Sequence, residues 1–331
     1  MLRCITAARM APSDPSARLA GALLGAATLT SLEAAREAGL EPAQARRLWR
    51  ALGFPPADDD ARLFTRSDVE ILQGVRAVVE MQDVSLDDLL QLTRVVGQSL
   101  ARVADAQVTT SAARLRSGGA AGNPAPEDLV ARIESLTPAL ERFLAYVWRR
   151  HLLAALRRWS ARPSPTDHVV TVGFADLVGF TAMSDALAPR ELAAMVDRFE
   201  SLAYEHIPER GGRVVKMIGD EVMFAVDDGS FAADIAIALV EACRRDAEVP
   251  DVRVGLARGP TLAWEGDLYG PTVNLASRLV NFARPATVLV SDALGELLKD
   301  DPRFELRHLR AVNLHGIGRL RSWVLRRARV A

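Results

Sequence analysis

The segment from Arg213 to Ala225 constrains the fold more than any other stretch of this chain. It reads Arg-Val-Val-Lys-Met-Ile-Gly-Asp-Glu-Val-Met-Phe-Ala, two short apolar runs joined at a Gly-Asp pair that suits a two-residue hairpin turn. Lys216 interrupts the first run, where an ammonium group is costly unless it finds a partner. Asp220 and Glu221 place adjacent carboxylates at the tip. Such a pair can bind a hard divalent cation, although turns are also rich in Asp for backbone reasons.

Length and composition limit the kind of protein. A chain of 331 residues with 49% hydrophobic and 25% charged residues is long enough for two globular domains. The net charge of -1 gives no overall case for a nucleic acid or membrane partner. Cys4 and Cys243 form neither a disulfide framework nor a zinc site, which favours a reducing compartment. The apolar run Leu19 to Leu32 is too short for a membrane helix. We therefore expect a cytoplasmic protein without a membrane partner.

The first half of the chain has the pattern of a helical domain. Capping residues at Thr30, Thr65 and Ser85 each precede an apolar repeat at helical spacing, and Pro42 suits the first turn of another helix. The Gly- and Pro-rich stretch from Ser117 to Pro126 is the clearest linker. We predict a helical regulatory domain at 1–120, a linker with connecting helices at 121–165, and a second domain at 166–331.

The segment 30–72 also resembles the start of MerR-type DNA-binding domains. Phe64-Thr-Arg-Ser-Asp68 matches the helix start that follows the wing in that family. A recognition helix would then carry Arg46, Arg47 and Arg50. The same arginines could instead line the solvated face of a regulatory helix. We favour that second interpretation, because the rest of the helical half has no basic stripe, and we do not expect a nucleic acid partner.

The second half alternates strands and helices. Strand-like runs at 168–175, 252–256, 287–290, 304–309 and 322–327 enclose the hairpin and three helical segments. The order β-α-β-β-α-β predicts a ferredoxin-like core with a C-terminal extension. The predicted fold class is therefore α+β, preceded by an all-α domain.

Three polar motifs follow one another through this half. Phe174-Ala-Asp-Leu-Val-Gly-Phe-Thr181 places Asp176 where a strand gives way to a turn. With Asp220 it could bind a pair of Mg²⁺ or Mn²⁺ ions at neighbouring strand ends. Asn274 and Arg278 are four residues apart, so they share one helix face, and their side chains suit an oxygen or phosphoryl ligand.

Together these motifs resemble the class III nucleotidyl cyclases over about residues 168–327. The matching patterns are Phe-x-Asp-x-Val-Gly-Phe-Thr, Lys-x-x-Gly-Asp-Glu and Asp-x-x-Gly-x-x-Val-Asn-x-Ala-x-Arg, in that order. The upstream helical half is similar to that of soluble mycobacterial-type enzymes with an autoinhibitory N-terminal domain. The resemblance implies an adenylate cyclase, regulated by that domain, which converts ATP to 3′,5′-cyclic AMP and pyrophosphate.

The resemblance also implies roles for single residues. Asp176 and Asp220 would bind two Mg²⁺ or Mn²⁺ ions per site, and Asn274 and Arg278 would stabilise the transition state. Because the family places these two sets on opposite protomers, the resemblance implies a homodimer with two equivalent sites.

Substrate contacts are implied in the same way. Lys216 and Asp267 would read the base, and ATP is the better match, since adenine offers an amino donor to Asp267 and a ring acceptor to Lys216. Phe180 and Thr181 belong to the substrate-binding motif.

One position departs from the family pattern. Where many members have a phosphate-binding Lys, this chain reads Leu314-His315-Gly316. His315 could substitute, Arg319 could take over the role, or His315 could be a turn residue without a ligand. This departure keeps open an alternative function: a catalytically weak nucleotide-binding module that controls a DNA- or protein-binding N-terminal domain.

Overall fold

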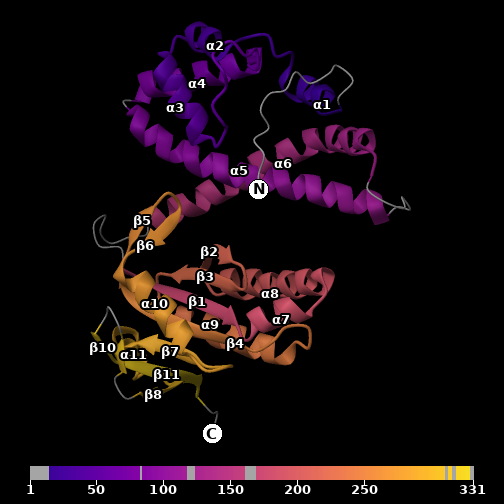
Figure 1. Ribbon diagram of the computed structural model, residues 1–331. Helices are drawn as coiled ribbons and strands as arrows, with labels where there is room; N and C mark the ends of the chain where they lie inside the picture. The colour runs from indigo at the N-terminus through magenta and orange to yellow at the C-terminus, as the bar shows by residue number, and fades with distance from the viewer. Residues whose placement is uncertain are drawn as a thin grey trace. The chain divides into compact units, whose positions relative to one another are not determined.

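The computed structural model describes residues 15–82, 84–117, 124–160, 169–309, 312–314 and 318–328. It divides the chain into two compact units, Met1–Ser160 and Ala161–Ala331, each with its own hydrophobic core (Figure 1). The finer predicted boundaries at residues 120 and 165 stay a prediction.

The first unit is helical, as predicted. Its helices are α1 (Pro15–Leu24), α2 (Ser31–Ala38), α3 (Pro42–Ala51), α4 (Arg66–Gln82), α5 (Leu86–Ser117) and α6 (Pro126–Ser160). The predicted capping box at Thr30 is formed, with the Glu33 N–H donating to the Thr30 hydroxyl and the Glu33 carboxylate accepting from the Thr30 N–H. Gly39 ends α2 in the left-handed conformation at φ 70°.

The core of the first unit is small and lies between α2, α3 and α4. Leu29 pairs with Phe64 in an isolated β-bridge, and Phe64 stacks against Trp49 with ring centroids 4.9 Å apart. All three arginines of α3 are exposed, and Arg47 forms an ion pair with Asp87. This exposure suits a solvated face as well as a nucleic-acid contact, so our choice between the two stays a prediction.

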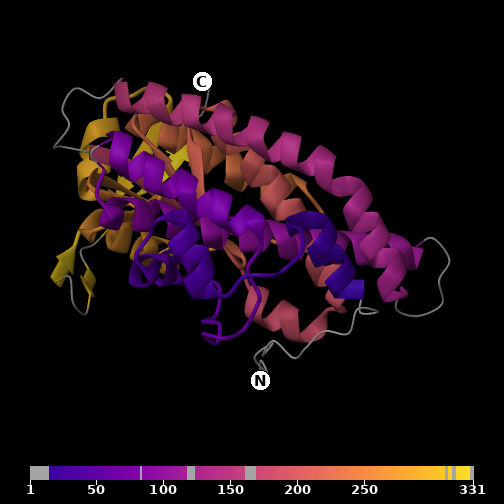
Figure 2. The ribbon, with the colours of Figure 1, turned by 90° about the horizontal axis from the view of Figure 1, so that it is seen from above.

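Helix α6 is one continuous helix of 35 residues, in the stretch where the sequence predicted connecting helices (Figure 2). Pro138 lies inside it, where the backbone loses one hydrogen bond. Among the residues that the structure describes, no helix is both long and apolar enough to cross a membrane.

The second unit is built on a seven-stranded sheet with the order β2-β3-β1-β4-β7-β11-β8. The strands of this sheet are β1 (Val169–Leu177), β2 (Arg213–Ile218), β3 (Glu221–Val226), β4 (Val252–Pro260), β7 (Val288–Ser291), β8 (Phe304–His308) and β11 (Ser322–Arg327). Two hairpins lie outside it, β5 (Leu262–Trp264) with β6 (Asp267–Tyr269), and β9 (Val312–Leu314) with β10 (Gly318–Leu320).

The predicted ferredoxin-like core is confirmed in the first four strands. Their order β2-β3-β1-β4 is antiparallel throughout, and the crossovers are α8 (Pro189–Glu209) and α9 (Gly229–Arg245). The C-terminal extension adds β7 parallel to β4, then β11 and β8. The remaining helices are α7 (Phe180–Ala186), α10 (Pro271–Phe282) and α11 (Asp292–Leu298).

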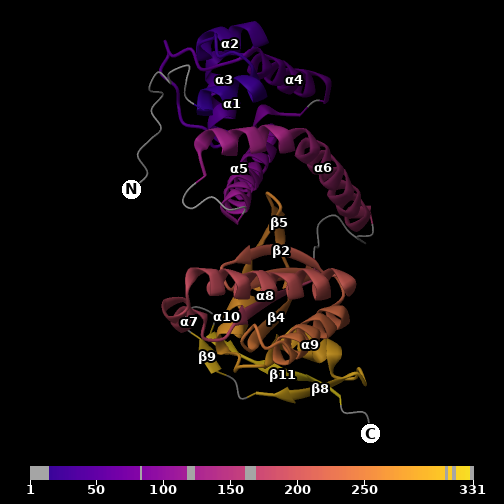
Figure 3. The ribbon, with the colours of Figure 1, turned by 90° about the vertical axis from the view of Figure 1, so that its right-hand side faces the viewer.

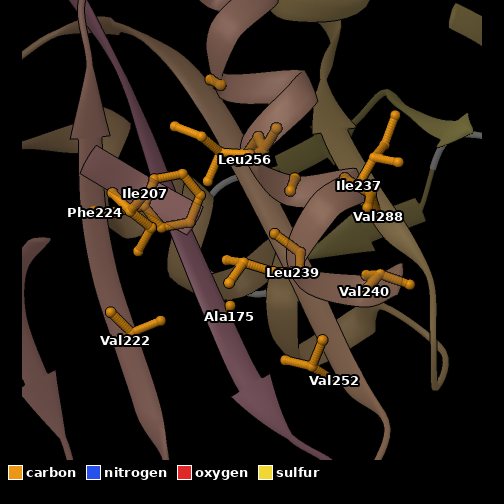
Figure 4. Packing of buried hydrophobic residues seen from close by; sticks show 14 of the residues in the cluster. Ala175, Ile207, Val222, Phe224, Ile237, Leu239, Val240, Val252, Leu256 and Val288 are labelled. Carbon is orange, nitrogen blue, oxygen red and sulfur yellow. The ribbon is translucent and has the colours of Figure 1, made fainter. Parts of the chain in front are cut away.

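The two faces of this sheet are covered differently. Alternate residues of β1 divide between them, with Ala175 and Leu177 in one buried cluster and Phe174 in the other. The first cluster packs under α8 and α9, which lie on one side of the sheet in Figure 3, and Figure 4 shows Phe224, Leu239 and Leu256 together in it. The second cluster packs under α10. We call this second side the α10 face.

Helix α10 lies very close to the sheet because of a glycine. A Cβ at Gly255 of β4 would come within 2.3 Å of the Val280 backbone nitrogen and 2.6 Å of the Ala276 carbonyl oxygen. Any larger residue would push α10 outward. Asp176 and Lys216, from the polar motifs of the sequence, lie on this α10 face.

Candidate active site

A row of charged side chains crosses three strands of the α10 face. Asp176 of β1 is directly opposite Arg253 of β4 on one side and Glu221 of β3 on the other. Paired residues of adjacent strands point to the same face, and the buried neighbours Ala175 and Leu177 occupy the opposite one. Asp220 follows at the turn between β2 and β3, where its carbonyl accepts the Leu177 N–H at 3.1 Å.

This row holds more negative than positive charge. Asp176 accepts from Arg253 twice at one carboxylate oxygen, from Nε at 2.7 Å and from Nη2 at 2.6 Å. Burial and the negative charge of Asp176 raise the pKa of Asp220 above its usual range. Burial, reinforced by Asp176 and Asp220, raises the pKa of Glu221 to about 7. A single guanidinium therefore faces three carboxyl groups.

The charge excess fits a divalent cation. Mg²⁺ or Mn²⁺ would neutralise the excess negative charge of these partly desolvated carboxyl groups. Asp176 and Asp220 present oxygens that could bind such an ion. Within the described ranges, no three His, Cys, Asp or Glu side chains come together as a metal site. Two carboxylates can suffice where Mg²⁺ is also bound by substrate phosphates and water.

A β-bulge places the second predicted pair. The register of β2 against β3 shifts between Val214 and Lys216, so Val214 lies opposite Phe224 and Lys216 lies opposite Met223. The extra residue turns Lys216 onto the α10 face, where Met223 is buried. Without the shift, Lys216 would point at the cluster under α8 and α9.

On that face Lys216 forms an ion pair with Asp267, which is 51 residues away in β6. The second oxygen of Asp267 accepts the Leu268 N–H at 2.7 Å. The structure therefore brings together the two residues that sequence reasoning assigned to the base.

Helix α10 presents Asn274 and Arg278 on the side away from the sheet. Its buried side chains Ala276 and Leu279 face the strands, whereas Asn274 is exposed and Arg278 is half-buried. Positions 274 and 278 lie roughly opposite that buried stripe at 100° per residue. Within one chain these two residues share a face, as predicted, but α10 does not direct them at the carboxylates.

With this geometry in place, comparison with known proteins gives a consistent result. The model of the adenylate and guanylate cyclase catalytic domain matches residues 163–327, and that of the adenylate cyclase regulatory domain matches residues 3–156. An adenylate cyclase of Streptomyces coelicolor is 40% identical over 300 residues, covering 88% of this chain and 78% of that protein. One from Streptomyces griseus is 39% identical, covering 86% and 72%. A pH-sensitive adenylate cyclase of Mycobacterium tuberculosis is 32% identical, covering 83% and 71%.

The chain belongs to the adenylate and guanylate cyclase family. The family prediction made from the three motifs is thereby confirmed, and so is the similarity to a mycobacterial enzyme with a regulatory domain.

Four further predicted residues of the cyclase are placed less decisively. Phe180 is half-buried against the cluster under α8 and α9, which anchors α7. Thr181 is exposed, and its carbonyl accepts the Ser184 hydroxyl at 2.8 Å. His315 lies outside the described residues. Arg319 lies on β10, and its side chain is likewise outside them. Their substrate contacts stay predictions.

Sequence reasoning missed Arg253. The signal was available, because an arginine inside the apolar run Val252-Arg-Val-Gly-Leu256 is as unusual as Lys216 in its own strand. What the sequence could not supply was the β1–β4 pairing that sets this guanidinium beside Asp176.

Proposed function

We propose that this cyclase is an adenylate cyclase, which converts ATP to 3′,5′-cyclic AMP and pyrophosphate. The observation that carries the proposal is the ion pair between Lys216 and Asp267 on the α10 face. A cation and a carboxylate held side by side match an adenine edge, with its ring acceptor next to its amino donor. Guanine reverses both groups. The names of the relatives agree with this choice.

The chemistry that follows is an intramolecular displacement. The ribose 3′-oxygen loses its proton and attacks the α-phosphorus, and the bond to the departing pyrophosphate breaks. Asp176 and Asp220 would hold two Mg²⁺ or Mn²⁺ ions, which supply positive charge at the phosphates and at the 3′-oxygen. Arg253 is already beside Asp176, so its guanidinium is suited to bind a phosphate of the same substrate. The chain mainly positions the substrate and balances its charge.

The complete site requires a second copy of the chain. Asn274 and Arg278 point away from the sheet that carries Asp176, so one chain is not arranged to bring both sets to one nucleotide. A homodimer related by a twofold axis can place α10 of one protomer over the carboxylates of the other, and it does so twice. Asn274 and Arg278 would then stabilise the charge that develops on the phosphate. We further propose that the helical unit regulates this assembly.

A direct assay tests the proposal. Purified protein is incubated with ATP or GTP and with Mg²⁺ or Mn²⁺, and cyclic product is measured. Cyclic AMP should form from ATP in preference to cyclic GMP from GTP. The exchange Lys216→Glu combined with Asp267→Ala should lower kcat/KM for ATP about 10- to 200-fold, because buried edge groups of adenine lose their partners.

Two outcomes would contradict parts of this assignment. Unchanged ATP turnover in the double variant would mean that other residues read the base. If the wild-type protein bound ATP but formed no cyclic product under any of these conditions, the nucleotide-binding module would become the better description.

A further inference from the structure

The second half of α6 buries none of its described side chains. The buried residues of this helix, Val130 and Ile133, both lie before Pro138. The ion pair of Glu134 with Arg18 is also in this first part. After Pro138 the helix continues for six turns in which no side chain is buried, and Figure 3 shows it extending past the other helices of the unit.

The apolar side chains of this half gather on one sector. At 100° per residue, seven consecutive positions around the helix span about 120° without a polar residue. They are Leu144, Ala145, Trp148, Leu152, Ala155, Leu156 and Trp159. We call them the Trp sector. Its largest members are well exposed, Trp148 at 63% and Trp159 at 64%. An exposed stripe of two tryptophans and three leucines is too apolar for a purely solvated helix.

The charges around the Trp sector are all of one sign. Residues 142–160 contain five arginines and no Asp or Glu. They are Arg142, Arg149, Arg150, Arg157 and Arg158. Arg149 borders the sector on one edge and His151 on the other.

This pattern disfavours a second copy of the same helix as the occupant. Two such helices that met through their Trp sectors would bring flanking arginines together in either direction, with no carboxylate in 142–160 to pair with them. An anionic lipid surface fits both the apolar Trp sector and the arginines, because the acyl chains can bury the apolar side chains and the headgroups attract the positive charges.

We propose that residues 142–160 of α6 dock on an anionic lipid surface. The helix lies in the plane of the headgroups, with the Trp sector inserted at the acyl boundary and the flanking Arg142, Arg149 and Arg158 at the phosphates. The net charge of the whole chain does not argue against this docking, because it does not reveal a local cluster of arginines within 19 residues. The lack of a membrane-crossing helix among the described residues does not argue against it either, because a helix lying on a surface need not cross the membrane. This proposal differs from the sequence-based expectation of no membrane partner, and it is independent of the proposed cyclase activity.

Vesicle flotation of the full-length protein tests the proposal. Vesicles of phosphatidylglycerol and phosphatidylcholine in equal parts are compared with vesicles of phosphatidylcholine alone. The test variant is Trp148→Ser with Trp159→Ser. The matched control is Phe143→Ser with Tyr146→Ser, which removes two equally exposed aromatic residues of the same helix outside the Trp sector. Circular dichroism and size-exclusion chromatography verify the fold and oligomeric state of each variant.

We expect the wild-type protein to float with anionic vesicles only and to be released as salt is raised. The sector variant should lose at least about tenfold in partition coefficient, whereas the control should bind nearly as the wild type does. Replacing Arg142, Arg149 and Arg158, the arginines that flank the Trp sector, by Gln should remove the preference for anionic lipid.

Absence of wild-type binding to anionic vesicles would overturn the proposal, and so would equal binding by the sector variant. A smaller oligomer in the sector variant, with no vesicle binding by the wild type, would identify the occupant as a second copy.

Discussion

Glu221 is a carboxyl group whose charged form the fold disfavours. It sits directly opposite Asp176 and next to Asp220, and burial with these two neighbours raises its pKa from 4.5 to about 7. A carboxyl group with a raised pKa in the folded chain is favoured there in its protonated form. The stability it contributes is complete below about pH 4.5 and is lost as the pH rises through 7.

We therefore predict that Glu221→Gln stabilises the metal-free second unit at pH 8 by about 1–2 kcal/mol, a value discounted because part of the carboxyl group faces solvent. The gain should vanish near pH 4.5. Urea unfolding of a chain that begins at Ala161, in the presence of a chelator, measures both. The control Glu305→Gln changes an exposed carboxyl on β8. Equal effects of the two substitutions at pH 8 would show that Glu221 is not under electrostatic strain.

Substitution of Asp176 or Asp220 should affect activity, whereas substitution of Glu221 should affect stability. Asp176→Ala or Asp220→Ala should lower cyclic AMP formation about a hundredfold or more, because the ions that neutralise phosphate charge lose their protein ligands. Thermal unfolding and dimer size should change little. Activity is measured over a range of Mn²⁺ concentrations, and near-normal turnover in either variant would exclude these carboxylates as the metal ligands.

Among the elements, α10 contributes most to the arrangement of the site. Its buried stripe fixes it on one sheet, and its other side carries Asn274 and Arg278. If that side serves the partner protomer, two inactive variants can complement each other. Equal amounts of Asp176→Ala and Arg278→Ala protein should recover about a quarter of wild-type activity, since half of the dimers are mixed and each has one complete site.

Subunit exchange is followed by differently tagged chains, and each variant alone provides the baseline. Full exchange without recovered activity would contradict a site shared between protomers.

Most of these elements could be predicted from the sequence, and the exceptions have physical causes. A strand with a strong pattern, such as β11 at 322–327, was predicted to the residue. The hairpin of β5 and β6 was missed because its strands have three residues each, and its turn uses Glu265 at φ 51° in place of the usual Asn or Asp.

The part of the candidate site that lies in sequence motifs could be predicted from the sequence. Asp176, Asp220, Lys216 and Asp267 were found from local patterns, and the structure adds how they meet. The bulge that turns Lys216 onto the α10 face depends on the pairing partner of β2, which a run of apolar residues does not specify. Arg253 was missed for a similar reason, since its importance comes from the strand beside it.

At the scale of the whole molecule, the helical unit and the catalytic unit have separate cores. The catalytic unit should therefore fold without its neighbour. We predict that a chain beginning at Ala161 forms an active dimer whose activity differs from that of the full-length protein and whose pH profile is flatter, because the regulatory bias on protomer register is gone.

The measurement is a pair of pH–rate curves at matched dimer concentration. Superimposable curves would mean that the helical unit does not regulate catalysis, and a role in partner or DNA binding would then be the better explanation for it.

The ion pair between Arg253 and Asp176 in the candidate site has a consequence for ligand selection. Arg253 holds Asp176, so the guanidinium proposed to bind a phosphate and the carboxylate proposed to bind a metal ion already neutralise each other within one chain. An ion pair within one chain forms at high effective concentration. A ligand can displace it only if it offers an opposite charge to both partners at once. A bare nucleoside has no phosphate for Arg253 and brings no ions for Asp176. We therefore expect the chain to discriminate against uncharged nucleosides.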